Sequence, residues 1–273
     1  MDRKALARQT LDIMKKGYYE IEGKIVEIGK LQEYAVQESV LFTPKQGEEL
    51  LDWVRQKEKT GVFSKDSVRV WNCSTVDTIL KLAAEEKEMG VLNFASAKNP
   101  GGGFLNGAKA QEESLAVSSC LYRTLTTHEE YYKENRLCES MMYTDYAIYS
   151  PNVVFFRDER FKLLEKPVLA SILTMPAVNM GQVRLKGEDI KRAEQVMRRR
   201  MQLVLAIFAK QGCRHLILGA YGCGVFRNDP KQIALWWNEL LTEYFPDQFE
   251  TIIFAVLDHS EKQSCIGAFE AIF

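Results

Sequence analysis

The chain has 273 residues, of which 46% are hydrophobic and 27% charged, and its formal net charge is −1. These values are typical of a globular protein, and the chain lacks the excess of basic residues that duplex-binding proteins usually have. No apolar run approaches the ~20 residues that cross a bilayer. The start lacks the apolar core of a secretory signal, and the six cysteines include no CxxC pair. We therefore predict a cytoplasmic protein without metal, membrane or duplex nucleic-acid contacts.

Residues 1–66 are predicted to form an N-terminal extension. The pattern indicates a helix over 2–18, a short hairpin over 19–28 that turns at Gly23, and a second helix over 47–59. The apolar content of this mostly helical segment is thin. We therefore expect it to pack on the core as an extension, not to fold as a separate domain.

Strands and helices alternate from residue 67 to residue 273, which we predict to form one domain. Strands are expected over 68–71, 91–95, 145–156 with a break at Pro151, 168–175, 215–220 and 251–257, and helices over 75–87, 112–125, 187–210 and 229–244. This alternation predicts the α/β class, with a mixed or largely parallel sheet that helices flank on both faces.

A glycine triplet at 101–103 follows one of the predicted buried strands, and Gln111, Glu112 and Glu113 then open a helix. Glycines let the backbone approach a ligand closely, and successive backbone N–H groups in such a turn form an anion site. Two carboxyl groups beside an anion site indicate acid–base chemistry next to a phosphate. The segment thus predicts an enzyme.

A second glycine-rich loop, at 222–226, follows the predicted strand over 215–220 and leads into a helix that Asp229 and Pro230 would start. Ligands of open α/β sheets bind at the carboxyl ends of the strands, where both glycine loops are expected. Two such loops suit a diphosphate held from two sides. Neither loop has the GxGxxG or the GxxxxGK[ST] pattern, which argues against a dinucleotide fold and a P-loop.

Three glycines, seven residues and then Gln-Glu-Glu resemble the motif of the poly(ADP-ribose) glycohydrolases. The segments Asn93-Phe94-Ala95-Ser96-Ala97 and Gly222-Cys223-Gly224-Val225-Phe226 are similar to the shorter, bacterial-type branch. The resemblance covers most of residues 67–273. It implies a macrodomain fold that binds ADP-ribose and hydrolyses the ribose–ribose O-glycosidic bond of poly(ADP-ribose), with ADP-ribosylated proteins as substrates and no cofactor or metal.

The resemblance also implies roles for individual residues. Glu113 is the catalytic acid and base, and Glu112 orients the ribose hydroxyls. Phe226 packs against the terminal ribose, which in the bacterial-type branch is associated with cleavage from chain ends. The implied ligand-binding residues are Gly101, Gly102, Gly103, Phe104, Gln111, Asn93, Gly222, Cys223, Gly224, Val225 and Phe226.

Helix geometry limits how the two glutamates work. Adjacent helical residues point ~100° apart, so Glu112 and Glu113 do not flank a sugar ring from opposite faces. Either one acid performs both proton transfers, or the substrate's diphosphate stabilises the cation. A helix N-terminus favours the carboxylate of Glu113, whereas a bound diphosphate and Glu112 favour its protonated form, which we expect to prevail with substrate. The alternatives are a module that binds ADP-ribose without cleavage, and a hydrolase of another ADP-ribosyl bond.

Overall fold

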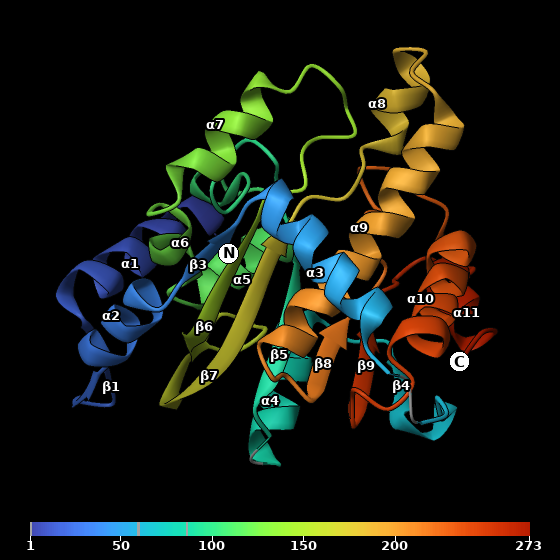
Figure 1. Cartoon of the computed structure of the whole chain (residues 1–273). Coiled ribbons are helices and arrows are strands. Elements are labelled where there is room, and N and C mark those ends of the chain that lie inside the picture. Colours follow the sequence, from blue (N-terminus) through green and yellow to red (C-terminus); the bar gives the residue numbers. More distant parts are fainter. Residues whose placement is uncertain (1, 59–60, 86) are drawn as a thin grey trace.

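A seven-stranded sheet runs through the centre of the molecule (Figure 1). The computed structural model describes residues 2–58, 61–85 and 87–273. In chain order the strands of this sheet are β3 (Val40–Phe42), β4 (Val68–Trp71), β5 (Met89–Phe94), β6 (Ala147–Arg157), β7 (Leu163–Met175), β8 (His215–Leu218) and β9 (Thr251–Ala255). Their order across the sheet is β3-β6-β7-β5-β8-β9-β4.

Most of the sheet is parallel. Strand β5 pairs in parallel with β7 and β8, and β9 pairs in parallel with β8 and β4. The pairs β6–β7 and β3–β6 are antiparallel. The sheet is therefore mixed, as predicted, and the carboxyl ends of β4, β5, β7, β8 and β9 meet at one edge.

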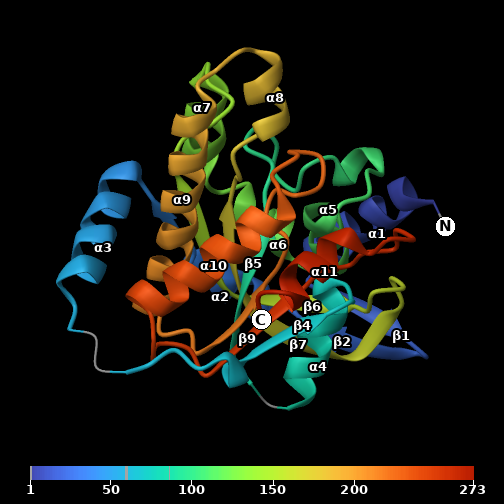
Figure 2. The same cartoon turned by 90° about the vertical axis from the view of Figure 1, so that its right-hand side faces the viewer.

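Helices cover both faces of the sheet (Figure 2). One face carries α3 (Pro44–Gln56), α8 (Met180–Leu185), α9 (Ile190–Lys210), α10 (Pro230–Tyr244) and α11 (Ser264–Glu270), and the other carries α4 (Thr75–Ala84), α5 (Gln111–Ser118), α6 (Leu121–Leu125) and α7 (Glu129–Leu137). Successive side chains of a strand point to opposite faces of the sheet: Leu216 and Leu218 pack under α9, whereas Ile217 packs under α4. The predicted fold class is confirmed.

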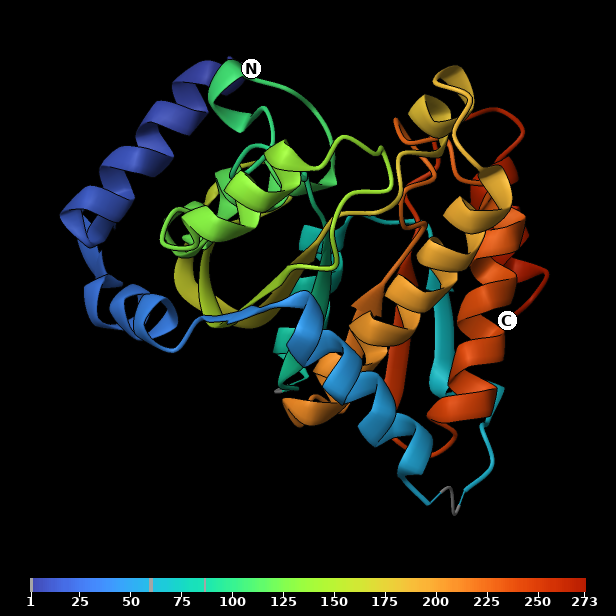
Figure 3. The same ribbon diagram turned by 45° about the horizontal axis from the view of Figure 1, so that its top comes forward.

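The chain before β3 lies beside β6 and β7 of the sheet (Figure 3). It consists of α1 (Arg3–Lys16), the hairpin β1 (Tyr18–Ile21) and β2 (Lys24–Glu27), and α2 (Gly29–Gln37). Leu6 of α1 packs against Phe104 and Val117, and Thr10 donates a hydrogen bond to the Val117 carbonyl at 2.7 Å. Strand β3 then joins the edge of the sheet. The domain division at residue 66 stays a prediction.

The structure corrects two predicted elements. The expected helix over 112–125 is divided into α5 and α6, because the Cys120 N–H bonds to the Val154 carbonyl of the sheet. The expected strand over 145–156 continues through Pro151 as β6. Pro151 lies at a register shift between Ser150 and Val153, where no ladder hydrogen bond requires its nitrogen.

Several short elements have no counterpart in the predicted pattern. They are α2, β3, α7, α8 and α11, together with the 3₁₀ turns η1 (Lys65–Ser67) and η2 (Phe104–Asn106). The helix predicted over 47–59 ends at Lys59, and the helix predicted over 75–87 includes Glu86. Both residues lie outside the part of the chain that the structure describes. Each of the missed elements is too short to show a clear hydrophobic period.

Candidate active site

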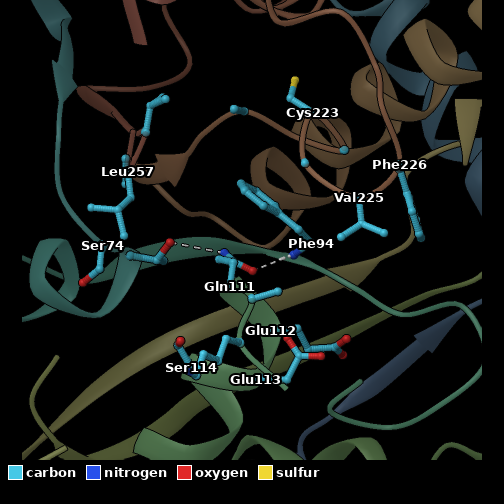
Figure 4. A pocket seen from close by; sticks show the side chains of 18 of the residues that line it. Ser74, Phe94, Gln111, Glu112, Glu113, Ser114, Cys223, Val225, Phe226 and Leu257 are labelled. Atoms are coloured by element: carbon cyan, nitrogen blue, oxygen red, sulfur yellow. Dashed lines mark hydrogen bonds between the residues drawn. The ribbon is translucent and has the colours of Figure 1, made fainter. Parts of the chain in front are cut away.

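A cavity of about 830 Å³ opens at the carboxyl edge of the parallel strands. Its lining comes from the loop over 222–226, from the segments 94–96 and 109–110 on either side of the glycine triplet, from the starts of α4 and α5, from the segment after β9, and from Arg3 of α1. The volume is in the range of clefts that bind nucleotide-sized ligands. The second loop thus lies at the cavity that Glu112 and Glu113 also line (Figure 4). Gly101, Gly102 and Gly103 are not among the residues that line it.

Gly102 lies against the carboxyl groups of Glu112 and Glu113. Its φ is +60°, and a Cβ at this position would lie 2.4 Å from Glu113 Oε1 and 3.0 Å from Glu112 Oε2. The backbone conformation and the space thus both require glycine. The loop brings the two carboxyl groups close together, although their Cα–Cβ bonds diverge on α5.

Glu112 is buried beneath the end of β5, with 3% of its surface exposed. Oε2 accepts a hydrogen bond from the Ser96 N–H at 2.6 Å, and Oε1 accepts one from Asn93 Nδ2 at 3.3 Å. Burial raises the pKa of Glu112 to about 8, and the neighbouring charge of Glu113 adds to the rise while the donors oppose it. Glu112 is accordingly a fixed carboxyl group with a strong tendency to hold a proton.

Glu113 lines the same cavity but has a different environment. Oε1 accepts a hydrogen bond from the Gly103 N–H at 2.8 Å. Oε2 is buried and has no hydrogen-bond partner among the described residues. One oxygen therefore fixes the side chain, and the other is a buried acceptor without a partner among the described residues.

Three residues that the sequence assigns to ligand binding make contacts within the protein, and of these only Gln111 also lines the cavity. Gln111 joins α5 to β5: its Oε1 accepts from the Phe94 N–H at 2.9 Å and its Nε2 donates to the Leu92 carbonyl at 2.8 Å. Asn93 is fully buried and supports Glu112. Phe104 is also fully buried and packs against Tyr122, so its side chain does not face the cavity.

The second loop forms the opposite wall of the cavity. Gly222 has a φ of +73°, and a Cβ there would lie 2.6 Å from Ala177 Cβ and from Asn228 Nδ2. Asn228 holds the loop, because its Nδ2 donates to the carbonyls of Val178 and Gly222 at 2.9 and 3.1 Å. Gly224 has no neighbour near its Cα that would exclude a ligand.

Val225 and Phe226 end this wall and line the same cavity as the two glutamates (Figure 4). Val225 is 84% exposed. Phe226 packs on Tyr143 with ring centroids 6.1 Å apart, and its carbonyl accepts from the Gly181 N–H at 3.0 Å. The exposed tip of the loop is therefore held by contacts at its base.

Cys223 is no candidate nucleophile. Contact with Cys265 and burial both raise the pKa of its thiol, and thiolate is the reactive form. Both cysteines are free thiols that line the cavity. Cys223 thus acts in the site through its position in the loop.

The sequence reasoning missed other lining residues. Leu257 and Asp258 follow β9, so their position after a parallel strand could have indicated them. Lys109 and Arg3 also line the cavity. Arg3 comes from the N-terminal helix, where no local pattern in the sequence indicates a site.

The described residues include no group of three or more His, Cys, Asp or Glu side chains positioned to hold a metal ion. None of the helices that the structure describes is long and apolar enough to cross a membrane.

The fold and the site together define a macrodomain-like α/β protein with paired glutamates in its ligand cavity. Comparison with protein families identifies the catalytic domain of microbial-type poly(ADP-ribose) glycohydrolase (PARG) over residues 7–158. The chain belongs to this family of glycosidases.

Solved structures of bacterial PARGs resemble this chain over almost its whole length. PARG from Thermomonospora curvata is 35% identical, with a TM-score of 0.92 and 99% of each chain covered; a complex of that enzyme with the inhibitor ADP-HPD is 36% identical, with a TM-score of 0.91 and the same coverage. PARG from Deinococcus radiodurans in complex with ADP-ribose is 41% identical, with a TM-score of 0.83, and the match covers 90% of this chain and 98% of that one. No protein of curated function matched the sequence.

Proposed function

We propose that the protein hydrolyses the ribose–ribose O-glycosidic bond of poly(ADP-ribose) from chain ends and releases ADP-ribose. Membership of the PARG family supports the reaction class. The bacterial PARG structures solved with ADP-ribose and with ADP-HPD support the ligand. ADP-ribosylated proteins are the proposed carriers of the polymer.

The observation that carries this proposal is the division of hydrogen bonds between the two glutamates. Both oxygens of Glu112 accept hydrogen bonds from the protein. In Glu113 only Oε1 does so, whereas Oε2 has no partner among the described residues. We assign Oε2 of Glu113 as the atom that exchanges a proton with the substrate.

The proposed reaction uses this atom twice. Glu113 Oε2 donates a proton to the leaving ribose oxygen as the bond to the anomeric carbon breaks, and the resulting carboxylate then takes a proton from the attacking water. The Gly103 N–H and the N-terminus of α5 stabilise that carboxylate between the two steps. Glu112, held by Ser96 and Asn93, orients the ribose hydroxyls.

We attribute the proposed cleavage from chain ends to the loop that ends in Val225 and Phe226. Phe226 is fixed by Tyr143 and by the Gly181 N–H, so the loop forms a wall at the end of the cavity where the glutamates lie. Such a wall accommodates a terminal unit and obstructs a polymer that continues past it. We also propose that the reaction proceeds without a metal ion and that the protein is cytoplasmic.

The test is product analysis with long poly(ADP-ribose). Wild type is expected to release ADP-ribose from the first time point, with no intermediate oligomers, as measured by anion-exchange chromatography. Glu113→Gln keeps the shape of the side chain but loses its acid, so turnover should fall by about 10²–10⁴-fold. Glu165→Gln, at an exposed position on β7, is the matched control.

Each of the other functions has its own outcome. Tight binding of the polymer by wild type without release of ADP-ribose would indicate a binding module. Release from mono-ADP-ribosylated protein but not from polymer would indicate a hydrolase of another ADP-ribosyl bond. Near-normal turnover by Glu113→Gln would refute the assignment of Glu113.

A further inference from the structure

Two cationic side chains, Arg3 and Lys109, line the cavity at the loop over residues 101–109, which we call the catalytic loop. The catalytic steps assigned to the glutamates use neither of them. In the part of the chain that the structure describes, no carboxylate forms an ion pair with either residue. Each polymer unit carries a diphosphate, which is an anion that a cation without an ion-pair partner at this cavity can bind.

A chain of contacts places Arg3 on the Glu113 side of the cavity. Arg3 Nη1 lies 3.5 Å from the Ala108 carbonyl. A Cβ on Gly103 would lie 2.8 Å from Ala108 Cβ, so Ala108 lies directly over Gly103. The Gly103 N–H in turn holds Glu113. Lys109, the next residue after Ala108, extends from the same segment.

Arg3 is held in place by its surroundings. Its guanidinium lies over the Phe161 ring, 4.8 Å from the ring centroid. Phe161 is fixed in its turn, because its carbonyl accepts from Arg157 Nη1 at 3.0 Å. The loop also packs closely on the start of α1, since a Cβ on Gly107 would lie 3.3 Å from Lys4 Cγ (Figure 3). The cation is thus fixed relative to the catalytic loop.

This position corresponds to the leaving side of the reaction. When a terminal ADP-ribose fills the cavity, the rest of the polymer departs from the anomeric carbon next to Glu113. The first diphosphate of that remaining polymer is separated from the cleaved bond by one ribose and a methylene group. It therefore emerges close to Glu113, where Arg3 and Lys109 lie.

We propose that Arg3 and Lys109 form a subsite for the diphosphate of the second ADP-ribose unit. The proposal rests on the function proposed above and deepens it, because it assigns a preference for polymer over a single ADP-ribosyl unit. The N-terminal helix thereby contributes directly to substrate selection. The terminal unit's own diphosphate is left to the backbone N–H groups of the two glycine loops.

The test measures binding in a Glu113→Gln background, so that substrate is not consumed. Calorimetric titration with ADP-ribose and with an ADP-ribose dimer should show about tenfold tighter binding of the dimer, and this preference should weaken as salt rises. Arg3→Gln with Lys109→Gln should abolish the preference and leave the affinity for ADP-ribose within about twofold. Arg3→Lys alone should retain most of it.

Arg8→Gln with Lys15→Gln is the matched control, since both residues are exposed on α1 and neither lines the cavity. This variant should keep the dimer preference. An unchanged preference in Arg3→Gln with Lys109→Gln would overturn the subsite. An equal loss of affinity for ADP-ribose and dimer would also overturn it, because it would show a structural role or a contact with the terminal unit. A charge-dependent dimer preference in a protein that cleaves no polymer would refute the proposed function alone.

Discussion

Glu112 and Glu113 are neighbours in the sequence, but their carboxyl groups have different surroundings. Glu112 is held by two donors and deeply buried, and burial raises its pKa to about 8. Glu113 is held through one oxygen only. The hydrogen bonds therefore place the two carboxyl groups in different environments, which agrees with the separate roles proposed for them.

The pKa of Glu112 predicts how stability depends on pH. The folded protein keeps a proton on Glu112 up to about pH 8, whereas the unfolded chain releases it near the ordinary value of 4.5. Between these two values the folded state binds more protons, so the free energy of unfolding falls as pH rises, by up to about 1.4 kcal/mol per pH unit from this group. Urea unfolding from pH 5 to pH 9 measures this slope.

Glu112→Gln removes the titrating group and should make the slope over this window shallower. Relative to wild type the variant should gain stability toward pH 9, because no charge has to be buried. Glu165→Gln removes a carboxyl group at an exposed position and should keep the wild-type slope. Identical slopes for Glu112→Gln and wild type would show that Glu112 does not hold its proton in the folded state.

At the scale of elements, the loop over 222–226 depends on one side chain outside it. Asn228 is 5% exposed, and its Nδ2 bonds to the carbonyls of Val178 and Gly222. It lies between the loop and α10, whose first turn is capped by Asp229. The loop is therefore held to the core at the point where its backbone would meet a ligand.

Asn228→Ala should lower the free energy of unfolding by about 1–3 kcal/mol, since buried carbonyl groups lose their donor. Affinity for ADP-ribose should fall as well, because the backbone N–H groups of the loop lose their fixed orientation. Thermal unfolding and calorimetric titration measure the two effects. Gln37→Ala, at an exposed position in α2, should change neither quantity. Unaltered affinity in Asn228→Ala would show that the loop keeps its shape without this side chain.

How much of the fold the sequence predicts depends on whether a feature is local. The parallel strands and long helices follow from hydrophobic period, and the two glycine loops follow from their place after strands. The continuation of β6 through Pro151 depends on a register shift between two strands, which is a property of the pairing. The prediction of one continuous helix over 112–125 was wrong for a similar reason, because the Cys120 N–H donates a hydrogen bond to a carbonyl of the sheet.

The site shows the same limit. Glu112, Glu113 and the second loop lie where the sequence predicts them. Gln111 and Phe104 belong to the same motif, yet one bridges α5 to β5 and the other packs against α1. A motif gives the residues that must be present but does not distinguish those that touch a ligand from those that support the loop. Arg3 reaches the cavity only because α1 packs on that loop, a contact between segments far apart in the chain.

At the scale of the whole molecule, the segment before α3 takes part in three structural units. Strand β3 pairs with β6 at the edge of the central sheet. The hairpin packs through Tyr19 on Phe156, and α1 packs on the catalytic loop through Leu6. Its removal would expose an unpaired strand edge and two apolar surfaces.

Two truncations distinguish these contributions. Deletion of residues 1–28 removes α1 and the hairpin but keeps β3, so the sheet should stay intact while turnover of poly(ADP-ribose) falls at least tenfold, because Phe104 and the loop over 101–109 lose their packing partner. Deletion of residues 1–43 also removes β3 and should yield a protein that aggregates, as measured by light scattering and size-exclusion chromatography. If the shorter protein were monomeric and turned over polymer at the wild-type rate, the N-terminal segment would be an appendage and the catalytic unit would begin after it. Loss of turnover in the first truncation with retained solubility would instead show that the extension is part of the active site.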